Sequence, residues 1–426
     1  MKPPIVIGLT GSIGSGCSKI ATHIESKNGF KRFSLSDILR RLAEADGKGP
    51  YGKTLTPEQR KELQDYGDHL RETKDHAYLA QQCFREFKPL LSEDAQEFVI
   101  DSIRNPAEVE FFRAVFQNFF LVAVYASRDV RWFRLSKDFG GNETAFGERD
   151  ERDKGDALIK YGQNVQICVD QADYLITNES NCKYPNDWES LLWEKTGEMV
   201  SLITNQEPRE PFYPELYMGQ AYAASMKSTC CKRKVGTVIV RFPGTKNAGQ
   251  YAVHQPLLVA SGWNEVPPGV QTCKELGGSS QDYCVKDEDV KRILRNKVQY
   301  CPGCGTKIED PTSLDSTSKC VECGANLAKD FCAGRQLDLC PAIHAEEASI
   351  LQVATLGGTS LIGTTLYTTT FPCLLCAKKV VDVGIIEVVF AEPYPMPQSL
   401  ELLERAGVTL TKFEGVTARS YFRLFQ

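Results

Sequence analysis

The sequence has no long apolar segment and no strong excess of charge of either sign. Its longest uninterrupted apolar run, FFLVAVYA at 119–126, is far shorter than the roughly 20 residues that a membrane-spanning helix needs. The first residues, MKPPIVIGLTG, lack the apolar region and the cleavage site of a signal peptide. With 50 basic and 55 acidic residues, the net charge of −5 provides no general attraction to nucleic acid or to anionic membranes. We therefore expect a cytoplasmic protein with no membrane partner.

The sequence also lacks internal repeats and low-complexity tracts. A chain of 426 residues usually forms more than one domain, so we expect two. In the N-terminal half, short apolar runs alternate with helical stretches, and this alternation favours a mostly parallel sheet covered on both faces. The runs lie at residues 4–10, 97–101, 119–126 and 172–178.

Three prolines and mixed charges interrupt this pattern at 205–217, which we interpret as a linker. It separates a first domain at 1–204 from a second at 218–426. After the linker we expect a helix, two strands, a cysteine-rich insertion at about 273–340, and then two further helices and strands. This order is typical of an α/β/α sandwich, so the predicted fold class is α/β in both domains.

Two short motifs of the second domain indicate a catalytic metal site. One contains His344-Ala345-Glu346, and the other is Pro372-Cys373-x-x-Cys376. Proline suits the start of a helix, and cysteines three residues apart lie on one helical face, so both thiolates can reach one ion together with His344. Three protein ligands and an open position are typical of catalytic zinc, with Glu346 placed to move protons. A histidine, a glutamate two residues later and a downstream P-C-x-x-C form the zinc nucleobase-deaminase signature.

The insertion contains a second regular cysteine pattern, C-x2-C followed after fifteen residues by C-x2-C. This spacing indicates a structural zinc with four thiolate ligands and no open position, which serves folding rather than chemistry. The predicted ligands are Cys301, Cys304, Cys320 and Cys323. Four further cysteines lie nearby with irregular spacing, so we expect ordinary thiols rather than a third metal site. They are Cys273, Cys284, Cys332 and Cys340.

The segment GLTGSIGSGCSKI at 8–20 has the strand–loop–helix context of a phosphate-binding loop, but Cys17 stands where the motif has lysine. The backbone N–H groups and the Ser18 hydroxyl remain available for phosphate and Mg²⁺, whereas the positive charge needed for phosphoryl transfer is missing. We therefore expect binding of ATP, GTP or a deoxynucleoside triphosphate with Mg²⁺, without efficient kinase turnover. The predicted nucleotide-binding residues are Gly11, Ser12, Ile13, Gly14, Ser15, Gly16, Cys17 and Ser18.

The stretches STCCKRKVGTVIV, ASGWNEVPPGV, HAEEASI and LYTTTFPCLLCAKKVVDVGIIEVVF closely resemble deoxycytidylate deaminases. The resemblance implies that Asn264 contacts the sugar of the substrate and that Tyr394 lies near the base. It places Glu265 where that family usually has glycine. Lys232 and Arg233 enter the first strand of this domain and are candidates for contacts with substrate phosphates, although exposed surface charge is an equally good interpretation.

The first domain resembles dephospho-coenzyme A kinase and other small-molecule P-loop kinases in IVIGLTGSIGSG, FSLSDILRRLAE and FVIDSIRNPAEVEFFR. The resemblance implies that Asp101 is an acid associated with Mg²⁺, with Arg104 beside it. RDERD at 149–153 is similar to part of an arginine-bearing lid.

Taken together, the two halves resemble the bacterial anti-phage deoxycytidine nucleotide deaminases. The resemblance implies conversion of dCTP, dCMP or both to the deoxyuridine nucleotide, control of activity by the P-loop domain, a homo-oligomer and, as in some members, an inhibitory small RNA. One alternative is a housekeeping dCMP deaminase with a nucleotide-sensing domain. Others are a tRNA or single-stranded DNA deaminase, which the acidic net charge disfavours, and a nucleotide-binding module with a silent deaminase.

Overall fold

The computed structural model describes residues 3–52, 55–92, 97–155, 159–179, 188–244, 255–278, 283–297, 300–301, 303–308, 318–327, 340–357, 359–392 and 397–425. The chain forms two compact units. One comprises 1–215 together with 414–426, and the other comprises 216–413. Tyr394, Cys332 and the remaining predicted features between these ranges lie outside the described residues.

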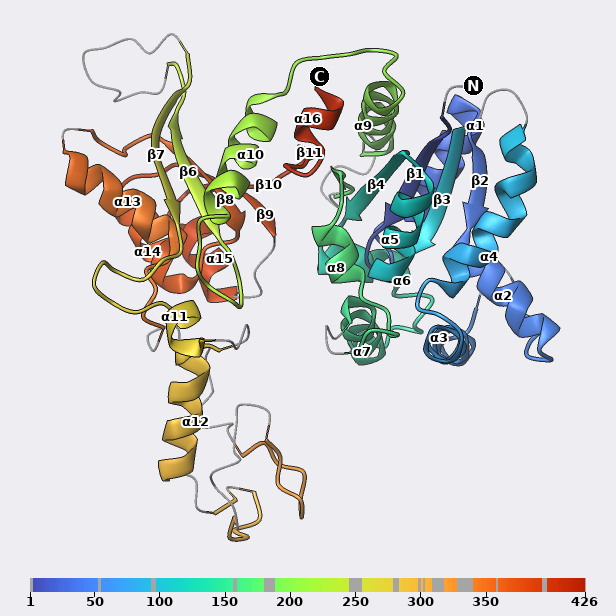
Figure 1. Ribbon diagram of the computed structural model, residues 1–426, viewed down its shortest axis with the longest axis horizontal. Helices are drawn as coiled ribbons and strands as arrows, with labels where there is room; N and C mark the ends of the chain where they lie inside the picture. The colour runs from blue at the N-terminus through green and yellow to red at the C-terminus, as the bar shows by residue number, and fades with distance from the viewer. Residues whose placement is uncertain are drawn as a thin grey trace. The chain divides into compact units, whose positions relative to one another are not determined.

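The first unit is a six-stranded sheet with the order β11-β5-β4-β1-β3-β2 (Figure 1). β1 pairs in parallel with both β3 and β4, as predicted for alternating strands and helices, and only the edge strand β11 is antiparallel. Its strands are β1 (Ile5–Thr10), β2 (Lys31–Ser34), β3 (Glu97–Ile103), β4 (Asn118–Tyr125), β5 (Tyr174–Thr177) and β11 (Gly415–Val416).

Helices surround this sheet, and β1, at its centre, is almost completely buried because strands of a parallel sheet are covered on both faces. The helices are α1 (Cys17–Asn28), α2 (Leu35–Ala45), α3 (Pro57–Thr73), α4 (Tyr78–Phe87), η1 (Lys88–Ser92), α5 (Pro106–Val115), α6 (Arg128–Leu135), α7 (Glu143–Lys154), α8 (Val165–Asp170), α9 (Trp188–Ile203) and α16 (Tyr421–Leu424).

The C-terminal residues 414–426 belong to the first unit, so the expected second domain at 218–426 is wrong at its C-terminal end. β11 pairs with β5, and the Ser420 hydroxyl donates a hydrogen bond to the Asp173 carboxylate at 2.5 Å. The Val416 N–H donates to Glu215 at 2.9 Å. The last five residues of the predicted linker, 213–217, are also helical, because Pro214 occupies the first turn of α10, where a missing N–H costs nothing.

The second unit is a five-stranded mixed sheet with the order β10-β9-β8-β6-β7. β6 is antiparallel to β7 and β8, whereas β8, β9 and β10 are parallel, and α13 packs against β7 and β6. Its elements are α10 (Tyr213–Ser225), β6 (Gly236–Arg241), β7 (Leu257–Trp263), α11 (Cys273–Gly277), α12 (Val285–Lys297), α13 (Ala345–Leu356), β8 (Thr365–Thr370), α14 (Leu374–Asp382), β9 (Glu387–Glu392), α15 (Pro397–Arg405) and β10 (Thr409–Lys412).

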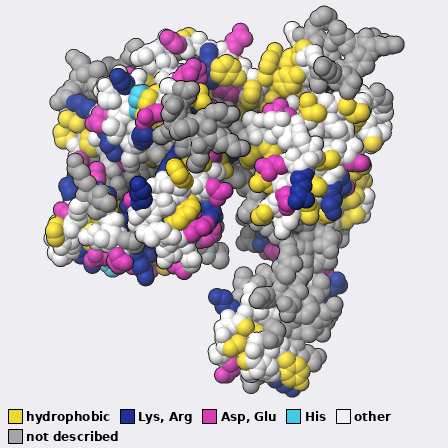
Figure 2. Space-filling view, turned by 180° about the vertical axis from the view of Figure 1, so that it is seen from behind, with side chains coloured by type: hydrophobic (Ala, Val, Ile, Leu, Met, Phe, Trp, Pro, Cys, Tyr) yellow, Lys and Arg dark blue, Asp and Glu magenta, His cyan; other side chains and the backbone are white. Residues whose placement is uncertain are grey.

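The surface carries charges of both signs. On the face shown in Figure 2, basic and acidic side chains lie interspersed on both units, as the nearly balanced totals of 50 and 55 predict. Among the described residues, no helix is long and apolar enough to cross a membrane. The α/β fold class predicted for both halves is confirmed.

Candidate active site

The predicted metal ligands of the second unit lie at the starts of two helices. His344 is the N-cap residue of α13, and Cys373 is the N-cap of α14, with Cys376 in its first turn. Pro372 precedes α14 rather than forming its first residue, because Cys373 has an extended backbone, with φ −71° and ψ 169°. The positive end of the helix dipole at the start of α14 favours thiolates at Cys373 and Cys376.

The structure brings His344, Cys373 and Cys376 together. The Nδ1 atom of His344 lies 3.3 Å from each of the two sulfur atoms. A tetrahedral zinc with Zn–S bonds of about 2.3 Å and a Zn–N bond of about 2.0 Å separates its ligand atoms by roughly 3.5 Å, so this set fits zinc. The contact between the thiols lowers the pKa of Cys373 to about 4 and raises the pKa of Cys376. Coordination of zinc requires both cysteines as thiolates.

Glu346 lies in the first turn of α13 and is buried, with 5% of its surface exposed. Burial is the main reason that the pKa of its carboxyl is raised. It contacts Cys376 and therefore faces the ligand set without belonging to it. A buried carboxyl beside a metal-ligand set is suited to proton transfer.

Close packing of α13 on β7 holds this glutamate in place, and Gly262 permits that packing. A Cβ atom at position 262 would lie 2.5 Å from both the carbonyl oxygen of Ala345 and the backbone N of Ser349. The Thr237 hydroxyl donates a hydrogen bond to the same Ala345 carbonyl at 2.9 Å. The first turn of α13, which carries Glu346, therefore packs directly against the sheet and is hydrogen-bonded to it.

We expect Gly262→Ala to impair the site although residue 262 is not one of the predicted ligands. The added methyl group must push the backbone of α13 away, and a displacement near 1 Å at a reacting group commonly lowers a rate about 100-fold. Deamination rate, zinc content and thermal unfolding of purified protein should be compared with those of Gly197→Ala in α9, where a Cβ meets nothing within 4 Å. Activity of Gly262→Ala equal to that of Gly197→Ala would contradict this explanation.

A pocket of about 250 Å³ opens beside Glu346 and the ligand set. Its lining includes Asn264, Lys232 and Arg233, which the sequence predicted, and Lys286 and Cys230, which it did not. Lys286 lies two residues after Cys284 near the start of α12, where no sequence pattern distinguished it. Two of the other thiols named above, Cys284 and Cys340, also line the pocket.

Asn264 connects this pocket to the segment that carries its cations. Its side-chain Oδ1 accepts a hydrogen bond from the Val235 N–H at 2.8 Å, and its Nδ2 donates to the Arg233 carbonyl at 3.0 Å. Glu265, in the position where glycine is usual, accepts a hydrogen bond from the Thr229 hydroxyl at 2.5 Å. The Glu265 backbone pairs with Ile343 and so fixes the residue before His344.

The four cysteines predicted to bind a structural zinc also converge, in one knuckle described at 300–301 and 303–308 and a second at 318–327. The sulfur atoms of Cys301 and Cys323 are 3.6 Å apart, as are those of Cys304 and Cys320. Each knuckle closes with the same pair of backbone hydrogen bonds, for example from the Gly305 N–H to the Cys301 carbonyl at 2.9 Å. This repeated geometry fits a closed tetrahedral site.

The phosphate-binding loop of the first unit is held from its carbonyl side. Arg131 donates to the carbonyl of Ile13, Arg134 donates to that of Gly14, and Asn178 donates to that of Ser15. Gly16 has φ 109°, and a Cβ there would lie 2.4 Å from the Asn178 amide. On the other side of the loop, the Ile13 N–H donates to the Asp153 carboxylate at 2.9 Å and the Ser15 N–H donates to the Ser12 carbonyl at 3.0 Å.

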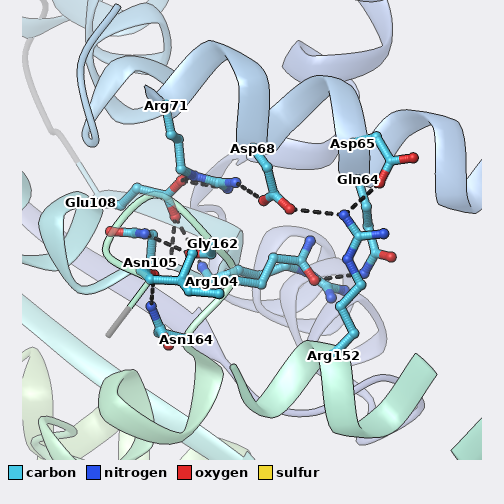
Figure 3. A network of polar contacts seen from close by, with 12 residues as sticks. Gln64, Asp65, Asp68, Arg71, Arg104, Asn105, Glu108, Arg152, Gly162 and Asn164 are labelled. Atoms are coloured by element: carbon cyan, nitrogen blue, oxygen red, sulfur yellow. Dashed lines mark hydrogen bonds and ion pairs between the residues drawn. The ribbon is translucent and has the colours of Figure 1, made fainter. Parts of the chain in front are cut away.

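Burial and ion pairing constrain two side chains near this loop, Cys17 and Asp101. Burial raises the pKa of Cys17 to about 11, so its thiol is neutral at pH 7 and does not replace the charge of lysine. Asp101, predicted beside Mg²⁺, is fully buried, and Arg32 binds its Oδ2 atom at 2.5 Å. Arg104 pairs with Asp153, whose carboxylate also accepts the Ile13 N–H at 2.9 Å. Figure 3 shows Arg104 reaching between α3 and α7.

Known proteins are similar to both halves of the chain. The family model of the cytidine and deoxycytidylate deaminase zinc-binding region matches residues 213–392. A deoxycytidylate deaminase of Schizosaccharomyces pombe is 26% identical over 413 residues, which cover 96% of this chain and 97% of the yeast protein. A UPF0200 protein of Methanothermobacter thermautotrophicus is 31% identical over 179 residues, covering 41% of this chain and 82% of that protein.

Viral deaminases are similar to part of the chain. A solved dCMP deaminase of the cyanophage S-TIM5 is 20% identical and has a TM-score of 0.28, over 48% of this chain and 99% of that one. The deoxycytidylate deaminase of Enterobacteria phage T4 is 32% identical over 191 residues, which cover 44% of this chain and 83% of the phage enzyme. The chain therefore belongs to the deoxycytidylate deaminase family.

Proposed function

We propose that this protein is a zinc-dependent hydrolase that deaminates deoxycytidine nucleotides, dCMP or dCTP. The observation that carries the proposal is the buried Glu346 carboxyl beside the convergent His344, Cys373 and Cys376. Family membership supports it, because relatives from yeast and phage T4 bear the name deoxycytidylate deaminase.

In this reaction water adds to C4 of cytosine and ammonia leaves, which gives the uracil nucleotide. Zinc held by the three ligands would supply a Lewis acid that lowers the pKa of a water molecule. Glu346 would accept one proton of the attacking water and transfer it to N3 of the base. It would then take the second proton, from the hydroxyl added at C4, and deliver it to the amino group, so that ammonia leaves as the C4–N bond breaks and the C4 carbonyl forms. Burial of Glu346 excludes bulk water from these transfers.

The pocket lining supports a phosphorylated substrate. Lys232, Arg233 and Lys286 contribute positive charge around the pocket. Asn264 forms hydrogen bonds with the backbone of Arg233 and Val235, just before β6, and so holds the segment that carries the first two cations. The acidic partners of Lys232 and Arg233, Asp287 and Glu392, are not among the lining residues. We propose that these cations contact the substrate phosphates and that Asn264 contacts the sugar.

A product assay tests this function directly. Purified protein would be incubated with dCMP, dCTP, CMP and CTP, each with and without ATP, GTP or dTTP, and the products separated chromatographically. We expect deamination of at least one deoxycytidine nucleotide and slower reaction of the ribonucleotides. Failure to deaminate any of the four under every condition would refute the proposal, and binding of a labelled oligonucleotide would favour a nucleic-acid deaminase instead.

We propose further that the P-loop unit binds a regulatory nucleoside triphosphate with Mg²⁺ and does not transfer its phosphate. The neutral Cys17 and the pairing of Asp101 with Arg32 support this view. We expect ATP to bind to the unmodified protein without measurable hydrolysis, and Cys17→Lys to bind it about tenfold more tightly, because it adds a charge-assisted contact. The matched variant Cys17→Ser, which stays neutral, should resemble the unmodified protein. Hydrolysis by the unmodified protein at about 1 s⁻¹ or faster, as in kinases, would contradict the proposal.

For the biological role we propose anti-phage defence by depletion of the deoxycytidine nucleotide pool, in a homo-oligomer that a small RNA could hold inactive. The fusion of a P-loop unit with a deaminase unit resembles the bacterial anti-phage deoxycytidine nucleotide deaminases, and this resemblance supports the proposal. A specific observation favours a second candidate, housekeeping dCMP deamination under nucleotide control. The yeast deoxycytidylate deaminase is similar over 96% of this chain, the P-loop unit included. Survival of phage-infected cells with and without the active protein would separate the two.

A further inference from the structure

Two of the cations proposed to contact the substrate phosphates, Lys232 and Arg233, lie in a segment between α10 and β6, 226–235, that is neither helix nor strand. Their side chains are 52% and 45% exposed, and each forms an ion pair with an acidic residue of another element. Exposed ion pairs contribute little to stability, so they hold the two cations only loosely. The position of both cations therefore depends on how the backbone of this segment is attached to the rest of the unit.

Asn264 attaches the C-terminal end of the segment. Its side chain accepts a hydrogen bond from the Val235 N–H at 2.8 Å and donates one to the Arg233 carbonyl at 3.0 Å. Its own N–H donates to the Val235 carbonyl at 3.2 Å, which extends the pairing of β6 with β7 by one position beyond Gly236 and Trp263. These bonds fix the chain after the two cations, and the chain before them needs other contacts.

Glu265 attaches the N-terminal end of the segment through its side chain. Its Oε1 atom accepts a hydrogen bond from the Thr229 hydroxyl at 2.5 Å and another from the Val266 N–H at 3.2 Å. The Val266 contact holds the carboxylate against its own turn, so Thr229 meets an oxygen atom that is already in place. One residue earlier, the Ser228 hydroxyl donates to the Asn264 carbonyl at 2.7 Å. Two consecutive hydroxyls thus bind two consecutive residues of the turn after β7.

The contact between Thr229 and Glu265 is the stronger kind of these two hydrogen bonds. A hydrogen bond to a carboxylate is roughly twice as strong as one between neutral groups. Glu265 is not among the described residues that line the pocket, so its negative charge acts on Thr229 and does not face a bound phosphate. The lining begins at the next residue, Cys230, and includes both cations.

The backbone of Glu265 contacts the catalytic side of the pocket. Its N–H donates to the Ile343 carbonyl at 3.2 Å, and the Ile343 N–H donates to the Glu265 carbonyl at 2.9 Å. Ile343 directly precedes His344, one of the predicted zinc ligands. Glu265 therefore binds the cation-bearing segment with its side chain and the residue before a metal ligand with its backbone. A bound nucleotide must reach from one of these places to the other, with its phosphate at the cations and its base at the metal ligands.

We propose that Glu265 is a positioning residue for nucleotide recognition, which through Thr229 holds the segment of Lys232 and Arg233 at the distance from the metal ligands that a deoxycytidine nucleotide requires. The proposal rests on the deaminase function proposed above. It adds a residue that determines how well the phosphorylated substrate binds without touching that substrate. With alanine at position 265 the backbone pairs with Ile343 remain possible, and the hydrogen bond with Thr229 is lost.

Steady-state kinetics of Glu265→Ala with dCMP and dCTP test the proposal. For the nucleotide that reacts faster, we expect KM to rise about tenfold, as loss of a charge-assisted hydrogen bond predicts, while kcat and zinc content change by less than about twofold. Glu265→Gln, whose amide oxygen can still accept from Thr229, should recover most of the affinity. Thr229→Val should resemble Glu265→Ala, and the double variant should be no worse than either, because all three remove one shared contact. Thr229→Val also measures this contact if Glu265→Ala does not fold.

Glu387→Ala is the matched control. Glu387 also accepts hydrogen bonds from threonine hydroxyls, that of Thr365 at 3.1 Å and that of Thr411 at 2.9 Å. It pairs with Thr365 at the opposite end of β8 from the lining residue Thr370, and it is not among the described lining residues itself. We expect the KM of Glu387→Ala to equal that of the unmodified protein. A merely structural role of Glu265 would instead lower kcat, zinc content and unfolding temperature together.

Isothermal titration of zinc-loaded Glu346→Gln protein with dCMP and dCTP, with and without Glu265→Ala, repeats the test where turnover is blocked. We expect Glu265→Ala to weaken binding about tenfold here as well. Unchanged KM and affinity in Glu265→Ala and Thr229→Val, or a lower kcat at unchanged KM, would overturn the proposal and leave the deaminase function standing. If the unmodified protein deaminated neither nucleotide, the proposed function would fail, and the titration would still decide whether Glu265 supports nucleotide binding. Absence of binding of both nucleotides would overturn the two proposals together.

Discussion

Glu346→Gln is expected to lower deamination by about 10²–10⁴-fold while zinc content and thermal stability stay unchanged. Glutamine has nearly the same shape as glutamate, so the packing of this buried position survives, but its amide cannot accept the proton of the attacking water. The ligand set of His344, Cys373 and Cys376 does not include Glu346, and the metal should therefore remain bound. Steady-state rates of nucleotide deamination and metal analysis of the same preparation measure both quantities.

The adjacent Glu347 provides a matched control on the same helix. Its carboxylate forms an ion pair with Lys379 at 2.7 Å and is 31% exposed, so Glu347→Gln removes the same charge one position away without touching the pocket lining. We expect this variant to keep nearly full activity. If Glu346→Gln retained more than about a tenth of the rate, or if both variants lost activity equally, Glu346 would not be the proton-transfer group.

The convergence of the two predicted ligand sets could be predicted because it depends mainly on local sequence. Two cysteines three residues apart at a helix start must share a face, and a C-x2-C knuckle closes within a few residues. The order of the two motifs along the chain was enough to predict that His344 lies beside this helix. The third cation of the pocket was harder to predict. Lys286 lies near the start of α12, where no sequence motif distinguishes it.

Features that depend on distant pairing were predicted poorly. Arg32 binds the Asp101 carboxylate from 69 positions away, and no local pattern around Asp101 indicated this pairing. The C-terminal strand joins the first sheet through contacts that span more than 200 residues, and two-residue strands such as β11 have no periodicity to recognise. β2 was missed for a related reason, since a short edge strand carries little apolar signal.

A matched pair of cysteine variants should separate the catalytic metal from the structural one. We expect two zinc ions per chain in the unmodified protein, and one in either Cys376→Ser or Cys320→Ser, because a hard hydroxyl binds zinc poorly in place of thiolate. Only Cys376→Ser should abolish turnover, since it removes a ligand of the site that Glu346 faces. The knuckle cysteine Cys320 holds a closed site in the insertion, and its loss should instead lower stability.

Zinc content by atomic emission, thermal unfolding and deamination rate distinguish these effects in one set of preparations. We expect turnover of Cys376→Ser to fall below detection, while the stability of the first unit stays unchanged. Proteolysis of the folded protein can monitor that stability. For Cys320→Ser we expect a lower unfolding temperature and measurable turnover at a temperature where the protein is folded. Full turnover of Cys376→Ser with one zinc lost would show that the His344 site is not catalytic. A closed four-thiolate site has no position for substrate, so complete loss of turnover in folded Cys320→Ser would contradict a purely structural role of the knuckles.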